Sequence, residues 1–123
     1  MTLDEDRVPP DNWERQVKKG WLELAILASL WGEALYGLDI LRRLEKETDL
    51  LLAEGTIYPI LSRLKSEGLV DTKWVDGEAG HPRKYYRLTP AGRHRSVAMA
   101  RYASGFLGSI EKVIAPLLAR EGK

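Results

Sequence analysis

The spacing of apolar residues changes twice along the chain, and this change is what most constrains the fold. Up to Glu67, apolar residues recur every three or four positions, which is typical of amphipathic helices. From Leu69 to Leu88 the spacing moves toward two, in a segment rich in Val, Thr, Trp and Tyr that is typical of strands. After Pro90 the helical spacing returns. The sequence therefore predicts a mainly α fold with one small β segment.

Three helices are predicted before this β segment. The first begins at Asp11, and Gly20 is a position where it can divide before Gly32 ends it. Its apolar face consists of Trp13, Val17, Trp21, Leu24 and Ala28. The second helix is predicted over residues 36–46, and the third from residue 53 or 54 to residue 67. The short run Leu50–Leu51–Leu52 between them is expected to form a small strand.

The β segment is predicted to be a hairpin. Gly68 stands where a helix C-cap glycine belongs, with Leu69 folding back as its hydrophobic contact. Strands are expected over 69–75 and 83–88, joined by the Gly- and Pro-containing loop 76–82. Three helices followed by a two-stranded hairpin are the layout of a winged helix-turn-helix domain, in which the hairpin is the wing.

A long helix completes the chain. Thr89 is expected to cap it, with Pro90 at the first position, where the missing N–H has no cost. The helix is predicted to reach at least Ala115, after which Pro116 should kink or end it. The tail from Ala119 onward is expected to fray.

The length of 123 residues is that of a single domain. We expect a flexible arm over 1–10, a DNA-binding winged helix-turn-helix over 11–89, and a dimerisation helix over 90–123. Glu23 and Glu33 interrupt the richest apolar stretch, so no membrane span is predicted. The acidic N-terminal residues do not resemble a secretory or transit peptide. The absence of cysteine fits a reducing cytoplasm.

Charge is divided unevenly along the chain. Residues 1–54 carry seven Lys and Arg against twelve Asp and Glu, whereas residues 55–123 carry twelve against six. Between residues 79 and 110 there are six basic residues and no acidic one. A positive side of this kind points first to a polyanion such as double-stranded DNA. An unevenly charged, solvated surface is the alternative.

No catalytic, cofactor or metal-binding residue is predicted. The two histidines, His81 and His94, are thirteen residues apart and match no metal-ligand spacing. The sequence contains no nucleophile elbow, no phosphate-binding P-loop and no dinucleotide-binding glycine motif. An enzymatic role is therefore not expected.

The third helix carries the residue types of a DNA-reading element. Gly55 permits close approach of a backbone, Thr56 can donate or accept a hydrogen bond, and Tyr58 has an aromatic ring with a polar end. The alternative is that these residues complete an ordinary helix N-terminus. The hairpin favours DNA binding, because Arg83 and Lys84 lie on its return strand with no carboxylate nearby in sequence.

Four sequence blocks resemble the PadR-type transcriptional regulators, which are winged helix-turn-helix repressors known for controlling phenolic-acid and multidrug stress genes. The blocks are residues 20–30 (GWLELAILASL), 36–37 (YG), 54–70 (EGTIYPILSRLKSEGLV) and 83–92 (RKYYRLTPAG). They cover roughly residues 20–92, and their combination is specific although each one alone is weak.

This resemblance implies a DNA-binding dimer. It places Tyr36, Thr56, Tyr58 and Arg63 at the major groove, and Arg83 and Lys84 on the DNA backbone. The complete set of expected DNA-binding residues is Tyr36, Gly55, Thr56, Tyr58, Arg63, Lys65, Arg83, Lys84 and Tyr85. One departure is the wing tip over residues 80–83 (GHPR), where relatives often carry further arginines, so wing contacts can differ here.

The last helix carries an apolar stripe that a small core cannot cover, which predicts a homodimer. A monomer whose tail folds back is the alternative. The single C-terminal helix also resembles the smaller PadR subgroup. The expected dimer-interface residues are Trp13, Val17, Met99, Tyr102, Phe106, Ile110, Val113, Ile114 and Leu117.

Two glycines, Gly105 and Gly108, lie inside this stripe, where each costs about 1 kcal/mol relative to alanine. Close approach of the partner helix, or room for a small aromatic effector, would compensate. The effector pocket is expected at Trp13, Tyr102, Gly105 and Phe106, although core packing explains the aromatic residues equally well.

The sequence thus predicts a cytoplasmic, homodimeric repressor that binds a pseudo-palindromic operator and is released by a small apolar effector. The rival hypothesis is a winged-helix protein–protein adaptor that does not bind DNA. Arg63, Arg83 and Lys84 favour DNA, because an adaptor has no need of all three.

Overall fold

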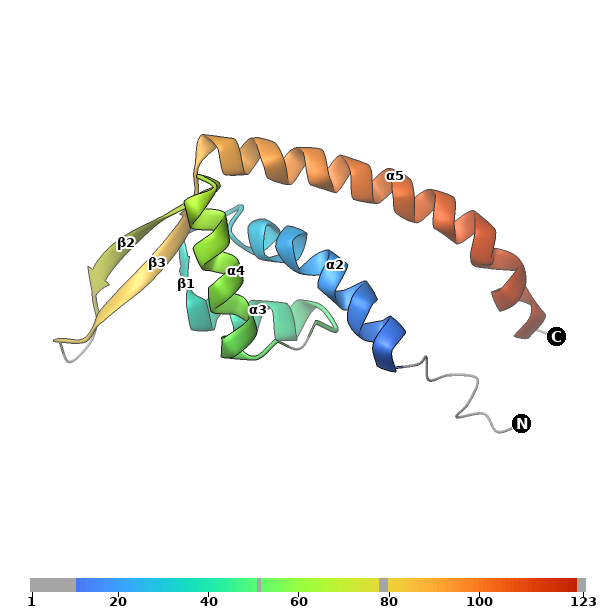
Figure 1. The fold of residues 1–123 in the computed structure, drawn as a ribbon, viewed down its shortest axis with the longest axis horizontal. Coiled ribbons are helices and arrows are strands. Elements are labelled where there is room, and N and C mark those ends of the chain that lie inside the picture. The colour runs from blue at the N-terminus through green and yellow to red at the C-terminus, as the bar shows by residue number, and fades with distance from the viewer. Residues whose placement is uncertain (1–10, 51, 78–79, 122–123) are drawn as a thin grey trace.

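The computed structural model describes residues 11–50, 52–77 and 80–121, which form helices packed against a small antiparallel sheet (Figure 1). The mainly α winged helix-turn-helix fold with a long C-terminal helix is confirmed. The arm predicted for residues 1–10 lies outside the described residues. In chain order the elements are α2 (Asp11–Ser29), β1 (Leu35–Tyr36), α3 (Gly37–Glu47), α4 (Glu54–Ser66), β2 (Val70–Asp76), β3 (Pro82–Leu88) and α5 (Pro90–Glu121).

The sheet has one strand more than the hairpin predicted from sequence. Its order is β1-β3-β2, and both pairs of neighbouring strands are antiparallel. In β1, Leu35 pairs with Tyr86 and Tyr36 pairs with Tyr85. The predicted helix start at Tyr36 was therefore wrong, since α3 begins one residue later. A strand of two residues is too short to show an alternating pattern, which is why the sequence did not reveal it.

The small strand expected at residues 50–52 is not formed by the described residues Leu50 and Leu52, which have no regular secondary structure. The division of the first helix at Gly20 was also wrong. Helix α2 runs through this glycine without a break and ends at Ser29, before Gly32.

Two helix boundaries follow the local chemistry predicted for them. Gly68 ends α4 with a positive φ of 76°, and the amides of Gly68 and Leu69 donate to the carbonyls of Lys65 and Leu64 at 3.0 and 2.9 Å. This pair of bonds is the Schellman motif, which needs a residue that tolerates a left-handed conformation. At the start of α5, the Thr89 hydroxyl accepts a hydrogen bond from the Gly92 amide at 3.0 Å.

Helix α5 does not end at Pro116, where a kink or an end was predicted. Helix α5 curves in its C-terminal part but continues through Pro116 to Glu121, so the fraying predicted from Ala119 is not seen up to that residue. A proline removes one amide donor from a helix. The neighbouring residues Val113 and Leu117 are 72% and 65% exposed, so water can bond the carbonyl that loses its partner.

The core lies where α2, α3, α4 and the sheet meet. Its fully buried side chains come from all of these elements: Ile26, Leu27, Leu30, Ile40, Ile57, Leu61, Leu64 and Val70. Tyr86 and Leu88 of β3 are buried against them, as the alternation of this strand predicts. The core therefore fixes both the angle of α4 and the root of the wing.

The first turns of α5 also belong to this core. Gly92 is buried, and a Cβ built there would overlap the backbone carbonyl of Leu69. Only glycine permits this close approach of α5 to the start of the hairpin. One turn later, Ser96 is 6% exposed and its hydroxyl donates to the Gly92 carbonyl at 2.7 Å. Met99 packs on the edge of the core.

Candidate nucleic-acid interface

Helix α4 has a buried face and two exposed stripes. Ile57, Leu61 and Leu64 are each 0% exposed and hold the helix on the core. Residues three, four or seven apart share a stripe on a helix, so Thr56 shares one stripe with Arg63, while Tyr58 lies about 140° away from Arg63. The expected DNA-binding residues of α4 therefore divide between two surfaces.

Tyr58 packs on the start of α3. A Cβ built on Gly37 would lie 2.6 Å from Cε1 and 2.7 Å from Cζ of the Tyr58 ring. The ring occupies this space because Gly37 has no side chain, and 38% of Tyr58 stays exposed. Burial, with smaller effects of Glu54 and Tyr36, raises the pKa of Tyr58. The phenol is thus neutral at physiological pH, and its hydroxyl can donate a hydrogen bond.

The sheet brings further expected residues beside this tyrosine. The rings of Tyr36 and Tyr85 are 5.8 Å apart, as the pairing of β1 with β3 requires. The guanidinium of Arg83 lies 4.8 Å from the centre of the Tyr36 ring. We call Tyr36, Tyr58, Tyr85 and Arg83 the tyrosine cluster. It joins α4 to the wing.

Arg42 of α3 adds a cation to this surface that sequence reasoning missed. Its Nη1 donates to the Tyr36 hydroxyl at 3.5 Å, and its side chain is 68% exposed beside Asp39. The only signal in the sequence is a basic residue six positions after Tyr36. This spacing becomes informative only once Tyr36 is known to be in a strand rather than in the helix.

Lys84 lies on the other face of β3. Its ammonium is 5.7 Å from the centre of the Tyr86 ring and 6.0 Å from that of Trp74 on β2. The alternation of the strand separates Lys84 from Arg83 and Tyr85. The wing therefore carries one expected cation on each face.

Arg63 lies apart from the tyrosine cluster. Its Nη2 is 2.8 Å from Glu23 of α2, and its Nη1 is 3.0 Å from Glu67 of α4. These hydrogen bonds, first that of Glu23 and then that of Glu67, raise the pKa of Arg63. The second oxygen of Glu23 accepts from Arg95 of α5 at 3.2 Å. Glu23 thus links the recognition helix to α5.

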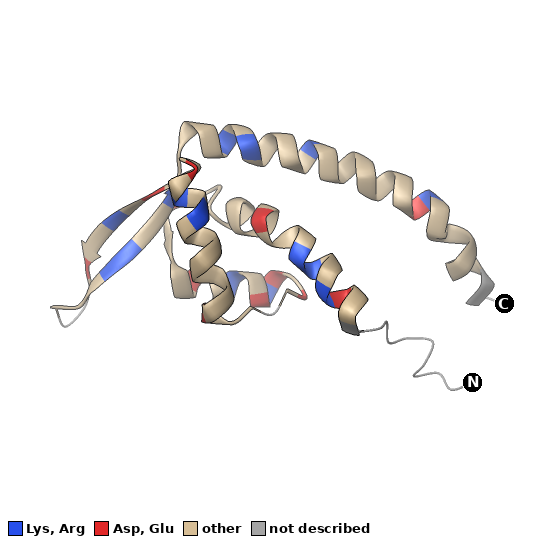
Figure 2. Cartoon of the chain, in the orientation of Figure 1, with Lys and Arg blue, Asp and Glu red and all other residues tan. Residues whose placement is uncertain are grey.

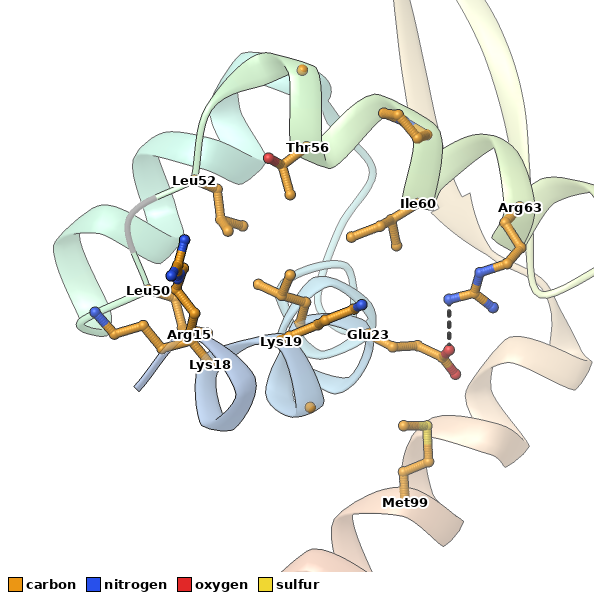
Figure 3. A pocket seen from close by; sticks show the side chains of 14 residues that line it. Arg15, Lys18, Lys19, Glu23, Leu50, Leu52, Thr56, Ile60, Arg63 and Met99 are labelled. Atoms are coloured by element: carbon orange, nitrogen blue, oxygen red, sulfur yellow. Dashed lines mark hydrogen bonds and ion pairs between the residues drawn. The ribbon is translucent and has the colours of Figure 1, made fainter. Parts of the chain in front are cut away.

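An open cavity of about 890 Å³ lies between α2, α4 and the edge of α5 (Figure 3). Arg15, Lys18 and Lys19 reach it from α2, opposite Thr56 and Ile60 of α4. Apolar side chains also line the cavity: Leu22, Leu50, Leu52 and Met99. None of the four expected effector-pocket residues, Trp13, Tyr102, Gly105 and Phe106, lines this cavity.

The other expected DNA-binding residues of α4 are exposed. Gly55 and Thr56 stand at its first turn, and a Cβ built on Gly55 would meet nothing within 4 Å. Lys65 is exposed in the last turn of the helix. The N-terminal turn of α4 is consequently open to a large ligand.

The C-terminal half of α5 exposes an apolar surface. Between residues 102 and 119 only Glu111 and Lys112 are charged, and Figure 2 shows this part of the helix almost without charge. The rings of Tyr102 and Phe106 stack 6.0 Å apart. We call the following exposed residues the α5 seam: Tyr102, Phe106, Leu107, Ile110, Val113, Ile114, Leu117 and Leu118.

The expected interface residues of the first helix are exposed as well. Trp13 and Val17 are 61% and 40% exposed on α2. Met99, in contrast, is partly buried against the core. The structure thus leaves most of the expected dimer residues uncovered within one protomer.

Comparison with known proteins decides the family. The model of the transcriptional regulator PadR-like family matches residues 26–97, which include α3, α4 and the whole wing. The chain belongs to the PadR-like family. Membership makes it a transcriptional regulator of a kind that acts through DNA, and PadR-like regulators are typically not enzymes. The match ends before the α5 seam begins, so family membership does not itself define this surface.

Relatives of this PadR-like chain share the fold and a moderate part of the sequence. A PadR-like transcription factor of Bacteroides fragilis is 35% identical, with a TM-score of 0.69 over 84% of this chain and 99% of the other. A PadR family regulator of Eggerthella lenta is 25% identical, with a TM-score of 0.74 over 84% and 89%. The transcriptional regulator Rv3488 of Mycobacterium tuberculosis is 33% identical over 64% of this chain and 72% of its own length.

The part of this PadR-like chain that the structure describes contains neither a cluster of candidate metal ligands nor a membrane-spanning helix. No group of three or more His, Cys, Asp or Glu side chains is placed to hold a metal ion. None of the described helices combines the length and the apolar character that crossing a membrane requires.

Proposed function

We propose that the chain is a cytoplasmic, sequence-specific DNA-binding repressor that acts as a homodimer. The observation that carries the proposal is the tyrosine cluster, which joins the exposed start of α4 to the basic wing through Tyr36. A recognition helix and a wing held in one rigid surface can occupy a groove and the adjacent backbone together. Residues 11–89 would form the DNA-binding unit, and residues 90–123 the dimerisation helix.

Base reading is assigned to the start of α4. Thr56 and Tyr58 are exposed side chains with hydroxyl groups, and Gly55 leaves room for a base edge or a phosphate. Tyr36 and Tyr85 would border the groove on the side of Tyr58, away from Thr56, with Arg83 and Arg42 meeting phosphates beside them. Lys65 and Lys84 would contact the backbone at the two ends of this surface.

Arg63 receives a different role in the proposal. Two carboxylates already hold its guanidinium, so free pairing with a phosphate would require breaking these bonds. We assign it to positioning α4 on α2 and, through Glu23 and Arg95, on α5. A change in the direction of α5 would then be transmitted to α4 through the ion pairs of Glu23 with Arg95 and Arg63.

The homodimer is proposed from the α5 seam. Eight large apolar side chains exposed along one helix are more than a soluble monomer usually presents. A second copy would cover them with its own seam and with Trp13 and Val17, in a closed two-fold interface. Two recognition helices related by this axis would meet a pseudo-palindromic operator one helical turn apart.

An effector would act through this interface. Tyr102 and Phe106 already stack in the free protomer, and Gly105 between them leaves open space beside the helix. A flat aromatic molecule would bind beside Tyr102 and Phe106, with Trp13 completing the pocket in the dimer. Its binding would alter the distance between the two recognition helices and so release the operator.

The proposal is tested by fluorescence anisotropy on a labelled duplex from upstream of the chain's own gene. A scrambled duplex of the same composition serves as the control, and both are titrated at low and at physiological salt. We expect preferred binding to the upstream duplex by a dimer, with affinity that falls steeply as salt rises. Equal binding to both duplexes at both salts would exclude sequence-specific repression at this site.

A further inference from the structure

The basic side of α2 borders the cavity in front of α4, and its cations have no role in the proposed function. The described lining residues include four cations, three from α2 and one from α4: Arg15, Lys18, Lys19 and Arg63. Glu23 is the one carboxylate among these described residues. Figure 3 shows the cations of α2 on one side of the space and Thr56 on the other. We call this space the basic groove.

Two of the four cations are already paired. A carboxylate oxygen lies 2.7 Å from the Lys18 ammonium, and another lies 2.8 Å from the Arg63 guanidinium. Among the side chains described from residue 12 onward, no carboxylate pairs with Arg15 or Lys19, and both residues are exposed. These two cations are therefore the part of the basic groove that can accept an anion without breaking an ion pair seen among those side chains.

A second hollow extends the basic groove toward the N-terminal end of α2. Its volume is about 770 Å³, and it shares Arg15, Lys19 and Gly20 with the first cavity. It reaches Asn12, one residue after α2 begins at Asp11. A continuous basic path thus leads from the point where the N-terminal arm (residues 1–10) joins α2 to the first turn of α4.

This path lies on the side of α2 that faces away from the proposed dimer interface. Successive residues of a helix are turned by about 100°, so Arg15 lies about 160° from both Trp13 and Val17. A second copy that covers Trp13 and Val17 would leave the basic path open. The α5 seam is also a poor occupant for the path, because its apolar side chains offer no negative charge to Arg15 and Lys19.

The N-terminal arm carries the opposite charge to the groove. It has one cation, Arg7, and three consecutive carboxylates: Asp4, Glu5 and Asp6. The seven residues from Asp4 to Asp11 can span up to about 23 Å, whereas Lys19 lies only about 12 Å along α2 from Asp11. The acidic run is therefore long enough to reach both Arg15 and Lys19, and it is attached at the open end of the path.

We propose that the acidic segment 4–6 docks in the basic groove of its own protomer and competes there with DNA. Its carboxylates stand beside Arg15 and Lys19, on the approach to Gly55 and Thr56. Each exposed ion pair is weak, but covalent attachment keeps the carboxylates at a high local concentration. The competition with DNA rests on the proposed function, whereas the docking does not.

The docking is tested in the full-length chain without DNA. Because the chain contains no cysteine, Thr2→Cys accepts a single nitroxide spin label on the arm. The spin-labelled, nitrogen-15-enriched chain is diluted into an excess of unlabelled chain, so that only effects within one protomer are observed. At low salt we expect the nitroxide to broaden the amide signals of residues 54–56. Arg15→Gln combined with Lys19→Gln should restore these signals.

The competition is tested by neutralising the arm without shortening it. Asp4→Asn, Glu5→Gln and Asp6→Asn together should raise the affinity for a random-sequence duplex about fivefold at low salt. The gain should shrink at physiological salt, because ions screen the pairs that hold the arm. The matched control removes the same charge from exposed positions far from the groove lining and should gain less than about twofold: Glu33→Gln, Glu45→Gln and Glu47→Gln.

Circular dichroism verifies that each variant is folded. Unchanged signals of residues 54–56 in the spin-labelled chain, or equal gains in affinity for the arm variant and the control, would overturn the inference and leave DNA binding intact. A wild-type chain that binds no duplex would instead overturn the proposed function. Broadening that disappears in the variant lacking Arg15 and Lys19 would still establish the docking in that case.

Discussion

The winged-helix core and the C-terminal half of α5 use the same side chains in opposite surroundings. Leu61 of α4 is 0% exposed, whereas Leu117 of α5 is 65% exposed. Both lie on apolar stripes with helical spacing. The difference teaches that such a stripe shows which face of a helix will be buried, but not whether the covering surface lies in the same chain.

The transition between the two regions lies within one helix. Gly92 and Ser96 are buried, Met99 is partly buried, and Tyr102 is 73% exposed. The core therefore ends along α5 between Met99 and Tyr102, although the helix continues without a break. The first turns of α5 are packed on the winged-helix core, so movement of the exposed half can be transmitted to the core rigidly.

The largest expected effect comes from removing a side chain from the core. Leu61→Ala should lower the free energy of unfolding by about 2–5 kcal/mol, because it leaves a cavity among fully buried side chains. Leu117→Ala removes the same atoms from the exposed seam and should change the stability of the monomer by less than about 0.5 kcal/mol. Urea unfolding at protein concentrations below the dimer range measures both. Similar losses of unfolding free energy in the two variants would contradict the difference between the buried core and the exposed seam.

The second-largest effect should be on the formation of the dimer and not on the stability of the monomer. Phe106→Ala combined with Ile110→Ala removes two apolar contacts from the α5 seam, and we expect the dimer dissociation constant to rise about a hundredfold or more. Sedimentation equilibrium measures it. Ser104→Ala, on an exposed position of the same helix, should leave the constant unchanged. A double variant that remains as dimeric as the wild type would exclude the seam as the interface.

A smaller effect is expected where the two regions are linked. Glu23→Gln removes the charge that holds both Arg63 and Arg95, and should cost about 0.2–1 kcal/mol of stability, since both ion pairs are partly exposed. Glu67→Gln is the matched control, because Glu67 pairs with Arg63 inside α4 and does not reach α5. We expect a few-fold loss of DNA affinity for Glu23→Gln alone. Equal losses for both variants would argue against a link to α5.

The smallest effect is a dependence on alkaline pH. The folded-state pKa of Tyr58 lies above its ordinary value of 10.0, so the neutral phenol is favoured by folding. The stabilisation is therefore complete below about pH 10 and is lost as pH rises through the folded-state pKa. Tyr58→Phe cannot ionise, so its melting temperature should fall less steeply above about pH 10. Parallel curves for the variant and the wild type would contradict this assignment.

Much of the fold was predictable because local signals agreed with it. Gly68 ends α4 and Thr89 caps α5 through bonds between near neighbours, so short sequence patterns were sufficient. Strand β1 was missed because its two residues acquire their pattern only by pairing with β3. At Pro116, where a kink or an end was predicted, the helix continues, because an exposed helix can leave one carbonyl to water.

The candidate site, like the fold, was predictable only in part. Residue types were enough to nominate Tyr58 and Arg83, and the family resemblance added Tyr36; the structure brings the three together. The sequence could not show that Arg63 is bonded to a carboxylate forty residues earlier. In the sequence, Glu23 is visible only as an interruption of an apolar run. Its role depends on three helices meeting, which no local pattern encodes.

By itself the sequence determined the order of the helices and the hairpin, the faces that they bury, the caps at Gly68 and Thr89 and the excess of positive charge in the second part. These properties depend on residues within a few positions of each other. Only the tertiary structure decided which cations remain open to a ligand, that the cations of α2 face the start of α4, and where along α5 the core ends. Each of these depends on side chains far apart in the chain being brought into contact, which only the packed core achieves.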